Sequence, residues 1–287
     1  MATASPLPIA QIVKLSVPEY DALPRIRSTS LKTIVEKSPK HFRFERIHKK
    51  PSTAAMQLGI ATHAALFEPA AYLRDVVTAD MAGKKSKQWD AFVLSHPGKI
   101  PILESEAETI SAMVEAIRQD PDAARFLQAG DPEMSVLWTD PDTGIDCMAR
   151  FDLIDETDPS NPIGIGLKTT RSLGKVFDRQ VDDFLYQLSW AMYREGYYHV
   201  RGVWPEMIEI VVETSEPHDV IVYRVEEEAI EAGTTLYRGA MREIAECTRT
   251  GVWPGVGRGG VQPLRLKPWA RGMHEEDNYQ LEETGES

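Results

Sequence analysis

The chain has 287 residues, of which 42% are apolar and 26% charged, with a formal net charge of −12; this composition fits one large globular domain or two small ones. No apolar run approaches the roughly 18 residues of a membrane-spanning helix, and the first residues lack the basic and apolar regions of a secretion signal. Two cysteines, Cys147 and Cys247, are too few for a disulfide framework or a thiolate metal cluster, which fits a reducing cytoplasm.

The charge is unevenly distributed along the chain. Residues 275–287 hold six acidic side chains and no lysine or arginine, so half of the net charge lies there. Residues 25–50 instead hold nine lysines and arginines against Glu36 and Glu45. A protein that is acidic overall can still present a local basic groove. The net charge therefore argues only weakly against nucleic-acid binding, and a solvated helix face would also explain the basic segment.

The first half of the chain is predicted to be helical. Helices are expected to begin at Ser28 and at Ser38-Pro39, and to cover residues 54–67, 89–94 and 104–127. Residues 83–87, Gly-Lys-Lys-Ser-Lys, are expected to form a basic loop.

The second half changes to strands. Strands are expected over residues 134–139, 145–153 and 163–169, separated by polar turns, as in a β-meander. A helix over 181–198, strands over 208–213 and 220–225, and a helix over 226–246 are expected to follow. This order predicts an α/β (α+β) fold with a mixed central sheet flanked by helices. We expect a flexible segment over 1–15, one domain over 16–270 and a disordered acidic tail over 271–287.

Two neighbouring strands carry the residues that suggest chemistry. Asp152 ends the strand Cys147–Phe151, and Lys168 follows the apolar stretch Ile163–Leu167. An ammonium on a buried strand is costly without a partner, so Lys168 indicates function, whereas an acid at a strand end such as Asp152, judged alone, is more often a turn former. Alternation along a strand places residues 166 and 168 on one face. Position 166, where a nuclease would carry an acid, is Gly166.

Further candidates are His63, Glu133 and Gln187. Hydrolysis of a phosphodiester with magnesium needs carboxylates that converge on one point, and Glu133 and His63 could join Asp152 there. His63 shares a helical stripe with apolar residues, so a hydrogen-bonded core histidine is the better interpretation of this residue taken alone. Gln187 lies on an aromatic helix and carries no chemistry by itself.

Taken together, these residues resemble the RecE (exonuclease VIII) branch of the PD-(D/E)xK nuclease superfamily, which has a restriction-endonuclease-like core. The resemblance covers roughly residues 16–270. It rests on these segments: Tyr20–Pro24 with Ser28–Leu31, Gly59–Pro69, Lys84–Trp89, Arg150–Asp152, Leu167–Thr170, Tyr186-Gln187 with Tyr193, Trp253-Pro254 and Pro268-Trp269.

The resemblance implies a metal-dependent exonuclease of phage or prophage recombination. Such enzymes use Mg²⁺, with Mn²⁺ as a substitute, and degrade one strand of linear double-stranded DNA from the 5′ end. The resulting 3′ overhang is passed to a RecT-like single-strand annealing recombinase. A homo-oligomer, as a ring or tetramer, is also implied, with no membrane partner.

The resemblance also implies roles for individual residues. The metal would lie among His63, Glu133, Asp152, position 166 and the Leu167 carbonyl. Catalytic roles would fall to Lys168, Asp152, Glu133 and Gln187. DNA would contact Lys84, Lys85, Lys87, Arg150, Thr169, Thr170, Tyr186 and Tyr193.

Gly166 departs from the family pattern, which has Asp at this position. We therefore expect an impaired nuclease, or one that holds its metal with His63, Glu133 and Asp152 alone, and we expect Gly166→Asp to restore cleavage. One alternative is a non-catalytic DNA-end-binding or recombinase-loading protein on a nuclease scaffold. Another is a nuclease for single-stranded or branched DNA.

Overall fold

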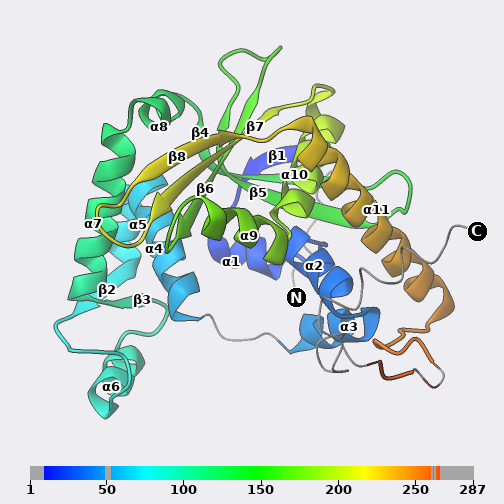
Figure 1. Ribbon diagram of the computed structural model, residues 1–287, viewed down its shortest axis with the longest axis horizontal. Coiled ribbons are helices and arrows are strands. Elements are labelled where there is room, and N and C mark those ends of the chain that lie inside the picture. Colours follow the sequence, from blue (N-terminus) through cyan, green and yellow to red (C-terminus); the bar gives the residue numbers. More distant parts are fainter. Residues whose placement is uncertain (1–9, 49–52, 260, 262, 266–287) are drawn as a thin grey trace, which may run out of the picture.

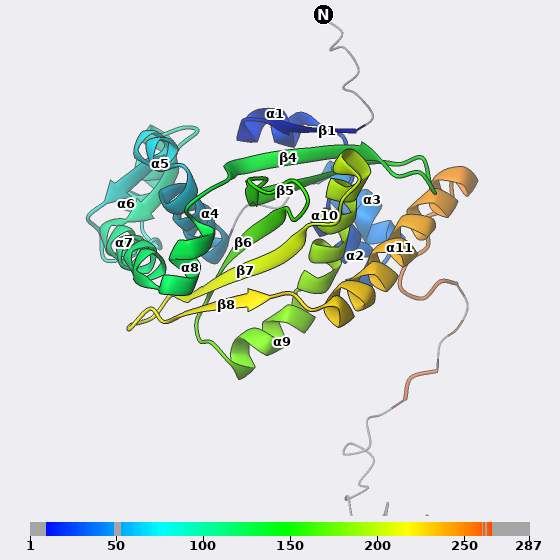
Figure 2. The same cartoon turned by 90° about the horizontal axis from the view of Figure 1, so that it is seen from above.

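A six-stranded mixed sheet lies at the centre of the computed structural model, which describes residues 10–48, 53–259, 261 and 263–265. Its strands, in spatial order, are β1 (Ala10–Lys14), β4 (Asp131–Thr139), β5 (Asp146–Asp155), β6 (Ile163–Thr170), β7 (Glu206–Glu213) and β8 (Val220–Arg224). Helices pack on both faces of this sheet (Figure 1 and Figure 2). The fold is therefore the predicted α/β class with a mixed central sheet.

The predicted meander is confirmed, because β4, β5 and β6 pair antiparallel in sequence order. Strands β6 and β7 then pair parallel, which requires the chain to cross over a face of the sheet between them. Helices α9 (Lys175–Asp183) and α10 (Tyr186–Arg201) form this crossover. The crossover brings residues about forty positions apart in sequence into lateral register.

Each face of the sheet has its own apolar core. One core joins the sheet to α10 and α11 (Glu227–Thr250), and to α2 (Ser28–Glu36) and α3 (Pro39–Ile47). The other joins it to α4 (Ala54–Phe67), α7 (Glu104–Gln119) and α8 (Pro121–Phe126). Short helix α1 (Val17–Ala22) lies beside β1. The sheet is thus buried on both sides, as its largely apolar strands require.

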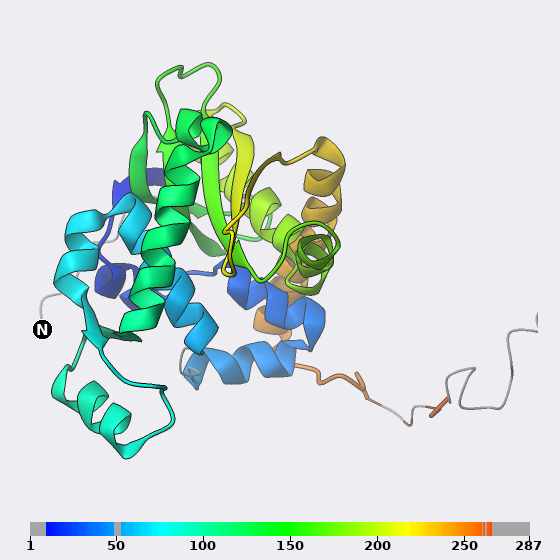
Figure 3. The ribbon, with the colours of Figure 1, turned by 60° about the vertical axis from the view of Figure 1, so that its left-hand side comes forward.

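A small substructure lies at one end of the molecule (Figure 1 and Figure 3). It contains α5 (Pro69–Asp75), the parallel pair β2 (Val76–Ala79) and β3 (Ile100–Leu103), and α6 (Lys87–Ser95). The sequence analysis did not predict β1, β2 or β3, each of which has only four or five residues.

Several sequence expectations need correction. Residues 10–14, expected to be flexible, form edge strand β1. The helix expected over 104–127 divides at Asp120, which caps α8 with its side chain. The helix expected over 181–198 divides at Leu185, whose φ of 48° is left-handed. The predicted acidic tail and Pro268-Trp269 lie outside the described residues. Within the described part of the chain, no helix is long and apolar enough to cross a membrane.

Candidate active site

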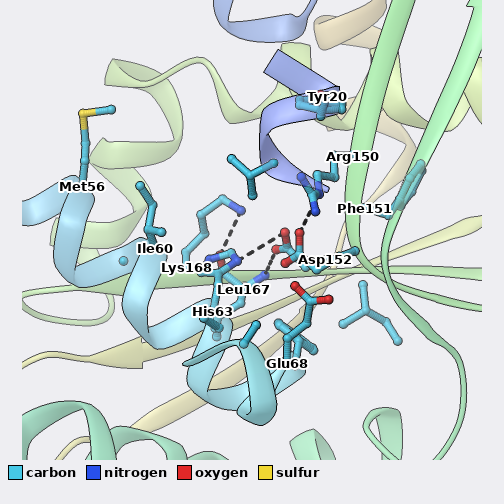
Figure 4. A pocket seen from close by; sticks show the side chains of 18 of the residues that line it. Tyr20, Met56, Ile60, His63, Glu68, Arg150, Phe151, Asp152, Leu167 and Lys168 are labelled. Carbon is cyan, nitrogen blue, oxygen red and sulfur yellow. Dashed lines mark hydrogen bonds and ion pairs between the residues drawn. The ribbon is translucent and has the colours of Figure 1, made fainter. Parts of the chain in front are cut away.

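A cavity of about 1220 Å³ contains Asp152 and Lys168 and is lined by helices from both faces of the sheet. Its walls come from β5 and β6 and from helices α1, α2, α4 and α10. Figure 4 shows His63, Asp152 and Lys168 pointing toward one another inside it. The two strands and the helix from which sequence analysis drew its candidates therefore meet at one place.

His63, Glu133 and Asp152 form the centre of this site. Each offers one ligand atom, and these atoms all lie within 4.8 Å of one another. His63 comes from α4, Glu133 from β4 and Asp152 from β5. The structure thus brings together three residues that lie far apart in sequence, as the resemblance implied.

The backbone at Glu133 is unusual. Its φ of 57° lies in the left-handed region, which a residue with a Cβ adopts at a cost of about 1–3 kcal/mol. The neighbours Pro132 and Met134 pair with Leu153 and Phe151, so Glu133 lies at the level of Asp152 along the two strands. Such strain persists where the surrounding structure fixes it and is concentrated at functional sites.

Asp152 lies where β5 and β6 diverge. The two strands pair only over residues 153–155 and 163–165. Beyond them the Asp152 carboxylate accepts a hydrogen bond of 2.7 Å from the backbone N–H of Leu167. Burial raises the pKa of Asp152, but His63, Lys168 and this hydrogen bond together hold it below its usual value. Asp152 is therefore an ionised carboxylate at neutral pH.

His63 is held by two acceptors. Its Nδ1 lies 3.3 Å from Asp152 Oδ1, and its Nε2 lies 3.0 Å from the Leu167 carbonyl oxygen. Burial lowers the pKa of His63, but the charge and hydrogen bond of Asp152 outweigh it and raise the pKa overall. Two acceptors on one ring favour the doubly protonated imidazolium, so His63 must release a proton before it can bind a cation.

The carboxyl pKa of Glu133 is shifted upward. Burial and the neighbouring Asp152 charge raise it to about 7, while Arg150 and His63 oppose the rise. Glu68, at the end of α4, also lines the cavity and adds a smaller repulsion. Acidic groups crowded in this way are stabilised by a bound cation.

Lys168 lies beside this cluster on β6. Its Nζ is 2.8 Å from Glu209 Oε1 and 3.1 Å from the Leu167 carbonyl oxygen, and it lies 5.5 Å from the centre of the Tyr186 ring. Burial lowers the pKa of Lys168, but Glu209 and Asp152 raise it well above its usual value. Lys168 is thus a fixed cation that can donate to a phosphate, and it is too basic to serve as a general base.

The other predicted residues divide into two groups. Arg150, Thr169, Tyr186, Tyr193 and the backbone of Gly166 line the cavity. Thr170, Gln187, Lys84, Lys85 and Lys87 do not line it.

Three of these outlying residues have other surroundings. Gln187 begins α10 beside α11, and its Oε1 is buried without a hydrogen bond, so the predicted catalytic role has no support in its position. Thr170 donates to the Ser172 carbonyl at the end of β6. Lys84 pairs with Glu106 of α7 at 2.7 Å and does not line the cavity.

Glu209 and Trp190, which were not predicted from the sequence, also line the cavity, and so does Lys32 of the basic segment 25–50, a segment expected from the sequence to contact DNA phosphates. Burial and the nearby Lys168 charge lower the pKa of Lys32 to about 8. The sequence did mark Glu209, because it is the one acidic residue in the otherwise apolar segment Met207–Val212, which is buried in β7. The sequence alone did not show that this strand borders β6.

The donor set fits a divalent cation. Two carboxylates and an imidazole, whose ligand atoms lie close together, match the oxygen and nitrogen ligands of Mg²⁺ or Mn²⁺. The raised pKa of Glu133 indicates negative charge that a cation would neutralise. A second group, Asp140, Glu195 and His199, is instead neutralised by Arg238, which pairs with both acids.

The mixed sheet, the diverging strands β5 and β6 and the acidic cluster with Lys168 define a nuclease fold of the PDDEXK type. Residues 28–265 match the family model described as a PDDEXK-like domain of unknown function (DUF3799), and the chain belongs to that family. The resemblance found in the sequence is therefore confirmed at the level of the superfamily.

One solved structure shows the same fold. A presumed exonuclease from Eubacterium rectale aligns with a TM-score of 0.61 and 10% identity, over 90% of this chain and 98% of its own. The protein SSO0001 aligns with a TM-score of only 0.32 and 16% identity, over 76% of this chain and 75% of its own. No curated protein sequence matches this chain.

Proposed function

We propose that this protein is a divalent-metal-dependent exonuclease that degrades linear double-stranded DNA from the 5′ end. The observation that carries the proposal is the convergence of His63, Glu133 and Asp152 beside Lys168 at the diverging strands. The family match and the fold of the Eubacterium rectale protein support a nuclease. The strand polarity and the duplex substrate rest on the resemblance to RecE.

Each residue has a defined part in this reaction. A divalent cation held by His63, Glu133 and Asp152 would activate a water molecule and neutralise charge on the phosphate. The Lys168 ammonium, kept charged by its acidic neighbours, donates to a phosphate oxygen as negative charge develops there. The backbone N–H of Leu167 fixes Asp152 in one orientation.

Two basic residues suit the path of the DNA backbone. Arg27 and Lys32 line the cavity from the start of α2. Arg27 pairs with Asp21 at 2.6 Å, whereas Lys32 lies over the Tyr186 ring at 5.2 Å. A partly buried ammonium with a pKa near 8 gains more from a phosphate than a solvated one does. Lys32 is the better candidate for a phosphate contact.

The partners follow from the resemblance. The proposal includes a homo-oligomer, as a ring or tetramer, and a RecT-like annealing protein that takes the 3′ overhang. Light scattering at micromolar concentration tests the first, and a monomer mass would contradict it.

The decisive test is cleavage of a linear 5′-phosphorylated duplex in the presence of Mg²⁺ or Mn²⁺. The wild-type chain should release nucleotides from the 5′ end, and Asp152→Asn or a chelator should abolish release. Asp158→Asn, which alters an exposed turn on the same hairpin, is the matched control. Circular, single-stranded and branched DNA in the same assay distinguish an exonuclease for linear duplex DNA from a nuclease that acts on single-stranded or branched DNA.

A non-catalytic DNA-end-binding protein is the alternative. It predicts that the wild-type chain binds duplex ends, that no metal ion produces cleavage, and that Asp152→Asn leaves binding unchanged.

A further inference from the structure

Gly166 and Glu209 are lateral neighbours on the parallel strands β6 and β7. A Cβ atom built on Gly166 would lie 2.4 Å from Glu209 Oε1 and 3.0 Å from Oε2. The shorter separation is comparable with that between Cβ and a carboxylate oxygen within an aspartate side chain. The Glu209 carboxylate therefore occupies the space that an aspartate at position 166 would fill.

Glu209 is an unexpected residue for its strand. Its neighbours Met207, Ile208, Ile210, Val211 and Val212 are all buried and apolar, and Glu209 itself is 2% exposed. Burying an ionised carboxylate costs several kcal/mol unless it is paired and hydrogen-bonded. An apolar residue would suit the core at lower cost, so packing alone does not explain an acid here.

The carboxylate of Glu209 is held in a fixed position. Oε1 lies 2.8 Å from Lys168 Nζ, and Oε2 accepts a hydrogen bond of 2.5 Å from Trp190 Nε1. Lys168 in turn contacts the Leu167 carbonyl, which His63 also contacts. Glu209 is therefore part of the same polar network as the His63, Glu133 and Asp152 cluster.

We propose that Glu209 supplies the carboxylate that β6 lacks at Gly166, so that the acidic position of the motif has moved to the neighbouring strand β7. The glycine and the glutamate then form one unit, because removal of the side chain at 166 creates the room in which the Glu209 carboxylate lies. Glu209, whose oxygens contact Lys168 and Trp190 and which is not one of the three residues with ligand atoms within 4.8 Å of one another, adds its negative charge beside His63, Glu133 and Asp152 and so strengthens their hold on the divalent cation. This inference rests on the proposed function.

The proposal changes two sequence expectations. Gly166 was expected to leave the site without its central acid and so to impair it; the structure places an acid there from another strand. Gly166→Asp was expected to restore cleavage, but the new side chain would overlap Glu209 and place two carboxylates together. We now expect Gly166→Asp to lower both thermal stability and metal affinity.

The test measures Mn²⁺ binding by calorimetry in the absence of DNA, alongside cleavage of linear duplex DNA. Glu209→Gln keeps the shape of the side chain and removes its charge. It should weaken Mn²⁺ binding by about 10-fold or more, since loss of even an outer partner of a metal site commonly costs 10–100-fold. Glu206→Gln, on the same strand but paired with the exposed Arg224, is the control and should bind as the wild type does.

A double variant that moves the acidic residue from β7 back to β6 makes the test specific. Glu209→Ala should lose Mn²⁺ affinity, and the double variant Gly166→Asp with Glu209→Ala should regain most of it, because the acid returns to β6 with space around it. Circular dichroism and thermal melting establish that each variant is folded. Glu209→Gln with wild-type Mn²⁺ affinity, or no recovery in a folded double variant, would overturn the proposal.

The outcomes also separate this inference from the proposed function. If the wild type cleaves DNA and Glu209→Gln cleaves equally well, the nuclease stands and Glu209 is not part of its site. If Mn²⁺ binding depends on Glu209 but no variant cleaves DNA, the metal site stands and the nuclease proposal fails.

Discussion

The Nε atom of Arg150 lies 2.7 Å from Oε2 of Glu133, at the edge of the acidic cluster. Both side chains are largely buried, and the same guanidinium lies over the Tyr20 ring and contacts the Leu15 carbonyl. Arg150 therefore has two effects. It partly neutralises a metal-binding carboxylate, and it attaches the segment around α1 to β5.

Arg150→Gln should weaken metal binding in a pH-dependent way. Without the guanidinium, the pKa of Glu133 should rise further above 7, because Arg150 is the first of the groups that oppose the rise. Mn²⁺ affinity measured by calorimetry should fall at pH 7 and recover by pH 9. An equal loss of affinity at both pH values would show that Arg150 acts by positioning the site and not by its charge.

The stability of the metal-free protein should fall as pH rises from 5 to 8. Glu133 has a pKa of about 7 in the fold against 4.5 as a free group, so the folded state retains a proton that the unfolded state has lost. Stability then decreases between these two values. The raised pKa of His63 acts in the same direction, because its favourable charge is lost as pH increases.

Thermal melting with and without Mn²⁺ checks this prediction. The rise in melting temperature on adding Mn²⁺ should be larger at pH 8 than at pH 5.5, where protons compete for the ligands. Glu133→Gln should flatten the metal-free pH dependence. A melting temperature that increases from pH 5 to 8 in metal-free wild type would contradict the assignment of both pKa shifts.

Part of the candidate site could be predicted from local patterns in the sequence, whereas the grouping of His63 and Glu133 with Asp152 came from the family resemblance. Alternation identified the meander, and Asp152 and Lys168 stood out on apolar strands. The sequence did not show which strands, and which residues on them, lie side by side in the sheet. Glu209 borders Gly166 only because the crossover through α9 and α10 sets the register of β6 and β7, and no local pattern encodes that register.

Some of the differences between the expected and the observed helices and strands were marked by residues in the sequence, and others were not. Asp120-Pro121 is a capping residue followed by proline, a recognisable helix start that divides the helix expected over 104–127. The left-handed conformation of Leu185 has no such signal, because leucine rarely adopts it. Strand β1 forms by pairing with β4, so its existence depends on tertiary contacts.

The basic loop before α6 should contact DNA outside the cavity, and with only two of its three lysines. Lys85 and Lys87 are exposed, whereas Lys84 is paired with Glu106 and lies over the Trp89 ring. Joint replacement of Lys85 and Lys87 by Ala should lower the salt slope of duplex binding by about two. Lys84→Ala should leave the slope unchanged and lower the melting temperature. A slope that is unaffected by the double replacement would make the loop a solvated surface.

Lys168→Met should abolish cleavage and destabilise the fold at the same time. Loss of the ammonium removes a donor to the phosphate, an effect of about 100- to 1000-fold on cleavage. It also leaves the buried Glu209 carboxylate without its cation, and breaking a buried ion pair in this way costs about 3 kcal/mol or more. Adding Glu209→Gln to Lys168→Met should recover part of that stability while cleavage stays absent. Urea denaturation of the wild type, both single variants and the double variant measures the coupling. Additive losses would show that Lys168 and Glu209 do not depend on each other.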